Sequence, residues 1–273
     1  MYSFFLHALR STPALVAVMV TMAMQIPAHA QFALAVSPPR FELQAKPGDR
    51  LREVIELSNS EPQASEYGVK TADWIFEKDA SVTLVDDLLP NTCRPWVAIE
   101  RRQVNVGPNQ TYRYRFEIAV PANAPTQECR FAVAIQGKEQ TVRQAGLPIP
   151  VSARMAVVVY LAVGDAKPQL SLVSATTRAV SNIKTAALLI KNSGNAHGRL
   201  EGVLTGVDAN GVELEFTPAS TPIMPGETRE ITLGASRFGA SDAPVSVRFP
   251  VKVSGKLEWG KNQAITLVQL FEP

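Results

Sequence analysis

Strict alternation of apolar and polar residues marks the segment 111–120 as a strand. The apolar members are Tyr112, Tyr114, Phe116, Ile118 and Val120, and the polar members between them are Arg113, Arg115 and Glu117. This pattern is typical of an antiparallel sheet with one face on a core and the other in water. Similar short strands recur along the chain between turns, and 20 prolines argue against long helices. The sequence therefore predicts an all-β protein.

The segment 149–163 departs from this alternation. Apolar and polar residues alternate in its first half, but from Ala156 onward apolar residues occupy both faces. The apolar run is too short to span a bilayer, and its β-branched residues favour a strand. Such a strand is covered either by its own fold, as a central strand, or by a partner. Pro148 and Pro150 favour an edge, because both remove N–H donors from the same side of the strand.

Alternation along this strand also suggests which face would contact a partner. We expect the odd-numbered row to point outward, because methionine is an adaptable contact at binding surfaces. That row contains Val151, Ala153, Met155 and Val157. We further expect the backbone from Ser152 to Val159 to be available for pairing. Parity alone does not distinguish the two faces, and a bulge would exchange them.

The first 30 residues have the features of a secretory signal peptide. Arg10 supplies the positive charge, residues 14–24 form an apolar run, and Ala28-His29-Ala30 provides a cleavage site of small residues. We expect cleavage before Gln31 and export to the bacterial periplasm. No membrane insertion is expected after the signal has been removed.

The remaining chain is long enough for two domains with cores of their own. Residues 164–168, Gly-Asp-Ala-Lys-Pro, form the best linker, which predicts domains at 31–165 and 166–273. Each half contains about seven or eight short strands separated by turns, including a tight hairpin at Asn210-Gly211. We therefore predict two immunoglobulin-like β-sandwiches in tandem.

Cys93 and Cys129 are the two cysteines of the chain. Disulfides persist in exported proteins, so we predict that these residues form one within the first domain. The alternative is a pair of buried free thiols.

The composition offers little for catalysis or nucleic-acid binding. The net charge is +2 with 19% charged residues, without the basic blocks that bind nucleic acid. His197 is the one histidine outside the signal peptide, in a loop-like segment where we expect it to contact water. One histidine and two distant cysteines do not make a usual zinc site, and no phosphate-binding glycine loop follows a strand. We expect a protein that is not an enzyme and that needs no metal or cofactor.

Two motifs resemble a known family, the periplasmic chaperones of pilus assembly, or PapD-like proteins. Residues 37–40, Ser-Pro-Pro-Arg, resemble the Ser-Pro-x-Arg with which that family opens, and the long apolar strand with Tyr160 resembles its donor strand. The resemblance implies two immunoglobulin-like domains and a strand lent to pilus subunits by donor-strand complementation. It also implies pilus or fibre subunits as partners, together with an outer-membrane usher.

The resemblance further implies that a basic pair binds the carboxylate at the end of a subunit. Arg40 matches the first basic residue of that pair. Val157 stands where the family has a lysine, and Arg154 is the one cation on the strand. Two other readings stay open: an exported β-sandwich scaffold or adhesion module without a chaperone cycle, and an enzyme acting on carbohydrate or another substrate.

Overall fold

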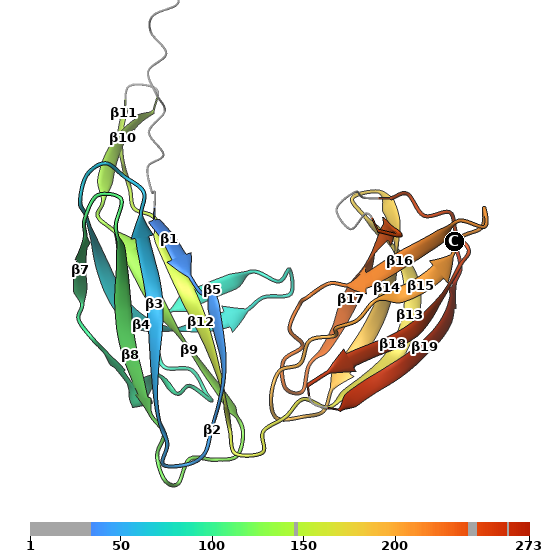
Figure 1. The fold of residues 1–273 in the computed structure, drawn as a ribbon, viewed down its shortest axis with the longest axis horizontal. Coiled ribbons are helices and arrows are strands. Elements are labelled where there is room, and N and C mark those ends of the chain that lie inside the picture. The colour runs from blue at the N-terminus through green and yellow to red at the C-terminus, as the bar shows by residue number, and fades with distance from the viewer. Residues whose placement is uncertain (1–33, 145–146, 240–244, 261) are drawn as a thin grey trace, which may run out of the picture. The chain divides into compact units, whose positions relative to one another are not determined.

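The computed structural model describes residues 34–144, 147–239, 245–260 and 262–273, whose regular secondary structure is almost entirely β-strand (Figure 1). Within these ranges the helical structure is a single turn of 3-10 helix, η1, at Arg94–Trp96. Strands β1 to β12 pair among themselves, as do strands β13 to β19. The predicted all-β fold of two sandwiches is confirmed. The predicted signal peptide, residues 1–30, lies outside the described residues.

The first sandwich contains two main sheets. One has the strand order β1 (Leu34–Ser37), β3 (Arg50–Asn59), β8 (Thr111–Ala119) and β6 (Val97–Ile99). The other has the order β2 (Arg40–Ala45), β12 (Arg154–Val163), β9 (Glu128–Gly137), β4 (Ser65–Phe76) and β5 (Val82–Val85), with β7 (Gln103–Val106) also paired to β4.

The alternation in β8 predicts its buried face correctly. Tyr114, Phe116 and Ile118 are buried. The ring of Phe116 meets that of Phe131 on β9 edge to face, with centroids 6.1 Å apart. Apolar side chains of the two sheets therefore form the core between them.

Pro38 and Pro39 lie where the chain passes from one sheet to the other. β1 pairs with β3, whereas β2 pairs in parallel with β12. The Ser37–Pro38 peptide bond between β1 and β2 is cis. Since proline offers no N–H to a strand ladder, it fits a segment that passes from one sheet to the other. This switch places Arg40 and Glu42 beside β12.

The second sandwich is built from seven strands. Their order is β13 (Leu170–Val180), β14 (Ile183–Asn192), β17 (Thr228–Arg237), β16 (Glu213–Pro218), β15 (Leu204–Val207), β18 (Val251–Trp259) and β19 (Gln263–Phe271). β17 pairs with β14 up to Thr232 and with β16 from Leu233 onward. It thereby joins two layers around a core that includes Leu188, Phe216 and Phe271.

The predicted hairpin at Asn210-Gly211 joins β15 to β16. The φ angle of Gly211 is 76°, a conformation that costs glycine little. Asp208 Oδ1 accepts the backbone N–H groups of Asn210 and Val212 at 2.9 and 3.0 Å, which fixes the turn.

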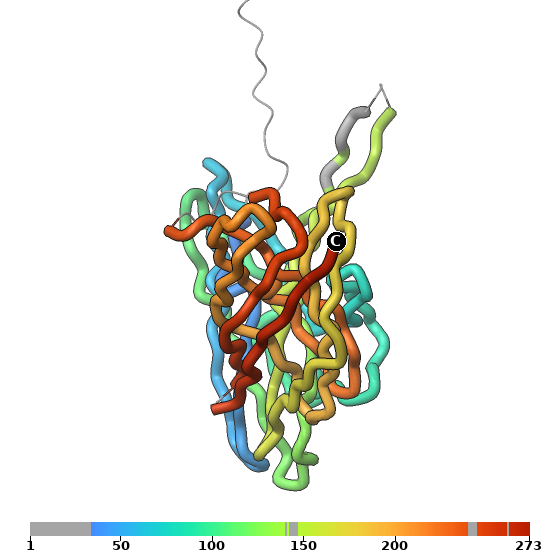
Figure 2. Tube along the Cα trace, turned by 90° about the vertical axis from the view of Figure 1, so that its right-hand side faces the viewer, coloured from blue at the N-terminus to red at the C-terminus, as the bar shows by residue number. Residues whose placement is uncertain are grey.

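The segment 149–163 is not one regular strand, contrary to our prediction. β11 (Leu147–Val151) ends before Ser152-Ala153, and β12 begins at Arg154. The preceding segment contains β10 (Gln140–Gln144), which pairs with β11 and continues the β9–β12 pair as a two-stranded ribbon. Figure 1 shows β10 and β11 projecting beyond the neighbouring strands, and the view turned by 90° in Figure 2 shows the projection of β11 as well.

The segment that joins β12 to β13 is held by hydrogen bonds. The backbone N–H of Lys167 donates to Asn195 Oδ1 at 2.9 Å, and the N–H of Asn195 donates to the carbonyl of Lys167 at 3.2 Å. Residues Leu34–Pro273 form one compact unit. The division into domains at residues 165 and 166 stays a prediction.

Candidate functional site

The pairing of β12 changes along its length. On one side it pairs with β9 from Arg154 to Ala162, but on the other side β2 reaches it only at Val158. In the described part of the chain, residues 154–157 thus have a strand neighbour on one side only. We call residues 154–157 the open segment. Unpaired N–H and C=O groups on such an edge are available to an added strand.

The expected free backbone from Ser152 to Val159 is therefore too long. β2 already occupies the edge at Val158 and Val159, where it pairs with Arg40 and Phe41. The alternation of side chains cannot reveal this, because β2 comes from a distant part of the sequence.

The two rows of side chains on β12 have different surroundings. The odd-numbered row includes Val157, Val159 and Leu161, all 0% exposed. The even-numbered row includes Ala156 and Val158, which are half-buried and pack around Trp74, Tyr160 and Met224 in a second apolar cluster.

The predicted outward orientation of Val157 is thus wrong, because Val157 belongs to the buried row. Met155 and Ala153 are half-buried, whereas Val151 on β11 is 40% exposed. The interruption at Ser152-Ala153 separates an exposed stretch from a buried one within a row that looks uniform in the sequence.

An exposed apolar row lies on β11. Leu147, Ile149 and Val151 are 68%, 39% and 40% exposed. They alternate with Pro148 and Pro150, whose register partners on β10 are Arg143 and Thr141. Three exposed apolar side chains on a short strand next to an open edge form a surface suited to a protein partner.

The two predicted cations of the site have different carboxylate partners. Arg40 Nε lies 2.9 Å from Glu42 Oε1, while Arg154 lies 3.6 Å from Asp86 Oδ1. Asp86 also accepts a hydrogen bond from Lys70. This hydrogen bond lowers the pKa of Asp86, and the charge of Arg154 lowers it further. The structure does not pair Arg40 and Arg154 with one common carboxylate.

The predicted disulfide between Cys93 and Cys129 is confirmed, with a Cα–Cα distance of 5.4 Å. It attaches the irregular segment after β5 to β9. Asp73 supports the same segment, because its carboxylate accepts the N–H of Leu89 at 2.7 Å and the hydroxyl of Thr92 at 2.6 Å.

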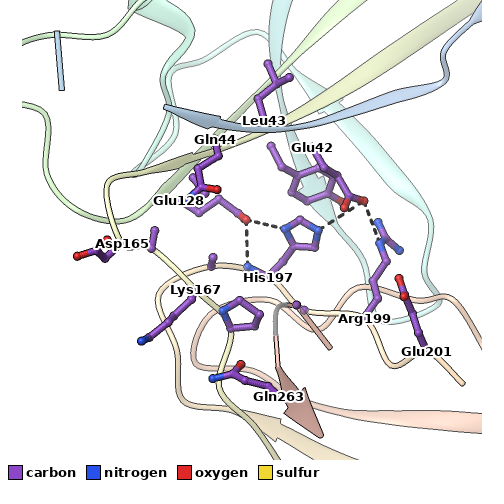
Figure 3. Close-up of a pocket in the computed structure, with 17 residues that line it drawn as sticks. Glu42, Leu43, Gln44, Glu128, Asp165, Lys167, His197, Arg199, Glu201 and Gln263 are labelled. Carbon is purple, nitrogen blue, oxygen red and sulfur yellow. Dashed lines mark hydrogen bonds and ion pairs between the residues drawn. The ribbon is translucent and has the colours of Figure 1, made fainter. Parts of the chain in front are cut away.

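His197 lies in a buried cluster and not in a water-exposed loop, contrary to our expectation (Figure 3). Its side chain is 8% exposed. Its Nδ1 is 2.5 Å from Glu128 Oε2, its Nε2 is 3.7 Å from Glu42 Oε1, and its ring centroid is 3.9 Å from that of Tyr160. Arg199 completes the group at 3.2 Å from Glu42. We call these five residues the junction cluster.

The junction cluster joins the two sandwiches. Glu42, Glu128 and Tyr160 come from β2, β9 and β12, whereas His197 and Arg199 come from the segment between β14 and β15. A cavity of about 650 Å³ lies beside the cluster and is also lined by residues of both sandwiches.

Several groups of the junction cluster have shifted pKa values. Interaction with His197 lowers the pKa of Glu42 to about 2, against the opposing effect of burial and with help from Arg199 and Arg40. Burial raises the pKa of Tyr160 to about 12. Burial would lower the pKa of His197, but Glu128 and Glu42 outweigh it and raise that pKa.

Other contacts between the sandwiches carry no titrating group near neutral pH. The N–H of Glu128 donates to the carbonyl of Asn195 at 2.9 Å, and the Asn195 side chain donates to the carbonyl of Thr126 at 2.8 Å. Arg229 donates to the carbonyls of Glu77 and Lys78.

Sequence reasoning missed the junction cluster. Glu128 and His197 lie 69 positions apart, and neither belongs to a recognisable motif. The one available signal is that His197 is the sole histidine after residue 30. Among the described residues, no group of three or more histidine, cysteine or acidic side chains could hold a metal, and no helix is long and apolar enough to cross a membrane.

No family model matches the chain, and no curated protein does. Solved structures similar in fold include the Class 5 fimbriae chaperone CfaA, which is 15% identical with a TM-score of 0.46 and matches over 88% of this chain and 99% of its own. The Pseudomonas aeruginosa CupB2 chaperone is 12% identical at a TM-score of 0.44, over 87% and 100% of the two chains. The E. coli chaperone DraB is 14% identical with a TM-score of 0.42, and the match covers 89% of this chain and 98% of DraB. The similarity is one of fold.

Proposed function

We propose that this protein is a periplasmic chaperone that binds subunits of a pilus or similar surface fibre by strand addition at β12. The observation that carries the proposal is the open segment, where one side of the backbone has no strand neighbour among the described residues. A partner strand placed there would satisfy N–H and C=O groups that otherwise bond only to water.

The open segment has defined limits. At its C-terminal end β2 occupies the edge from Val158. At its N-terminal end Pro148 and Pro150 have no N–H groups to offer an added strand. We therefore expect continuous backbone pairing with the subunit to be confined to the open segment, residues 154–157.

Side chains beside the open segment would supply the contact with the subunit. The exposed row of Leu147, Ile149 and Val151 continues toward Ala153 and Met155. In this proposal the row inserts into the hydrophobic groove of a subunit that lacks a strand. Met155 and Ala153, both half-buried, mark where the client-facing part of the row passes into the core.

Arg40 and Arg154 are proposed to bind the subunit by charge. Arg40 is exposed and lies in register with Val158, where the open segment ends. Its guanidinium can bind a carboxylate at two points. Binding of a subunit carboxylate would require Arg40 to exchange its partner Glu42, and Arg154 to exchange Asp86.

Site-specific crosslinking in the periplasm tests this proposal. A photoreactive residue at position 151 should crosslink short β-rich subunits, identified by mass spectrometry, and the Met155→Asp change should abolish the product. The matched control is position 268, because Val268 is an equally apolar strand residue of the second sandwich with 67% exposure. Equal products at both positions, or none at 151 while subunits still co-purify, would favour the scaffold or adhesion reading.

A further inference from the structure

We propose that His197 is a pH-sensitive tie between the two sandwiches, which is tightest when the imidazole carries both protons. The inference goes beyond the proposed function, since it concerns the junction cluster and requires no client. It rests on how the two ring nitrogens face two carboxylates of the other sandwich.

The first carboxylate fixes one proton on the ring. Glu128 Oε2 accepts the backbone N–H of His197 at 3.0 Å and lies 2.5 Å from Nδ1. An ionised carboxylate only accepts hydrogen bonds, so Nδ1 must carry a proton. The other oxygen of Glu128, Oε1, is buried and has no hydrogen-bond partner among the described residues.

The sign of the interaction with the second carboxylate, Glu42, depends on whether Nε2 carries a proton. Nε2 lies 3.7 Å from Glu42 Oε1. When the imidazole carries two protons, Nε2–H points a positive group at this oxygen. When the imidazole is neutral, its one proton stays on Nδ1, and the lone pair of Nε2 faces a negative oxygen. The contact with Glu42 therefore changes from attraction to repulsion.

The other charged groups at the junction leave His197 as the counterion of Glu128. Arg40 and Arg199 both bind Glu42, at 2.9 and 3.2 Å. Arg199 also lies 5.9 Å from the ring of Tyr160, which stays neutral because burial raises its pKa.

More distant charges do not replace His197 in this role. Arg130 lies over Trp74, and Asp165, Lys167 and Glu201 line the cavity beside the cluster. Since a buried charge is costly without a partner, the neutral imidazole leaves Glu128 poorly compensated.

The direction of the pH dependence follows from the shift at His197. Its pKa in the folded protein is raised above the ordinary value of 6.5, mainly by Glu128 and Glu42 acting against burial. A group with a raised pKa contributes its full stabilisation below the ordinary value and loses it as pH rises through the folded value. The tie should therefore be complete in mildly acidic solution and loosen as pH rises through that raised pKa.

The sandwiches should not separate when the tie loosens. The backbone contact between Glu128 and Asn195, the hydrogen bond from Asn195 to Thr126 and the Arg229 contacts contain no group that titrates near neutral pH. The expected change is faster opening of the junction, not dissociation.

The test combines NMR titration of His197 with amide hydrogen exchange at Glu128, whose N–H bonds across the junction. The full chain is used, with the His197 ring signals assigned by their loss in His197→Gln. We expect His197 to titrate above its ordinary value in the parent and lower in Glu128→Gln. Protection of the Glu128 amide, taken as the ratio of parent to His197→Gln, should be greatest at mildly acidic pH and fall as pH rises.

Two results would overturn the inference: titration of His197 at or below its ordinary value, or a protection ratio that does not change with pH. If Glu128→Gln does not fold, Glu42→Gln provides the second variant, because Glu42 is partly exposed. It should also lower the pKa of His197, and an unchanged pKa in that variant would contradict the role given to Nε2.

Discussion

The two ends of β12 are both rich in apolar residues but differ in their strand pairing. At the start of the strand, residues 154–157 have one strand neighbour, and the adjoining β11 exposes Leu147 and Val151. At the other end β2 and β9 flank the backbone, and Tyr160 is buried beneath His197. Apolar content alone therefore does not distinguish a core strand from a strand with an open edge. The difference lies in which strands pair with it.

The largest effect should distinguish the buried odd-numbered row of β12 from the exposed row of β11. Val157→Asp places a carboxylate in the core, at a cost of several kcal/mol that is comparable with the whole stability of a domain. We expect this variant to be unfolded. Val151→Asp, in the exposed row of β11, should change the free energy of unfolding by less than about 0.5 kcal/mol. Circular dichroism and thermal unfolding measure both, and a well-folded Val157→Asp protein would contradict the burial of that row.

Removal of the disulfide should have the next largest effect. The Cys93–Cys129 bond closes a loop with a sequence separation of 36, and the chain-entropy model gives about 3–4 kcal/mol for such a loop. Urea unfolding of the double alanine variant measures the loss. Because the bond ties the segment after β5 to β9 and not to the open segment, binding of a fibre subunit should survive at low temperature. Loss of binding in a folded variant would show that the two regions are not independent.

The smallest effect should appear at acidic pH, at the end of β12 that β2 and β9 flank. The pKa of Glu42 is lowered to about 2, mainly by His197. A lowered carboxylate pKa adds stability above the ordinary value, which is lost as pH falls through the folded value. The parent should therefore lose thermal stability relative to Glu42→Gln as pH falls from about 4.5 toward 2. The same comparison with Glu56→Gln, whose carboxylate lies in an exposed ion pair with Arg113, serves as the control. Parallel curves for parent and Glu42→Gln would contradict the shift.

The strands were predictable because a period of two is a local signal. The alternation at Tyr114, Phe116 and Ile118 identifies the buried face of its strand, and Asn210-Gly211 identifies a hairpin turn. The disulfide was also predictable, since the expected export favours a disulfide and two cysteines allow one pairing.

The site was less predictable because its features depend on distant segments. The orientation of Val157 follows from the interruption at Ser152-Ala153 and from packing against the other sheet. The limit of the open segment is set by β2, which lies more than 100 positions earlier. The burial of His197 requires Glu128 and Tyr160 from another sandwich. None of these contacts between distant segments is visible in the local sequence pattern.

Amide hydrogen exchange along β12, with and without a bound fibre subunit, tests strand addition at the open segment. In the free protein, those amides of residues 154–157 that point away from β9 should exchange rapidly, whereas the amides of residues 158–163 should be protected on both sides of the strand. Addition of a subunit should protect the first group and leave the second unchanged. Strong protection of residues 154–157 in the free protein, or binding of a subunit without any new protection there, would contradict strand addition at the open segment.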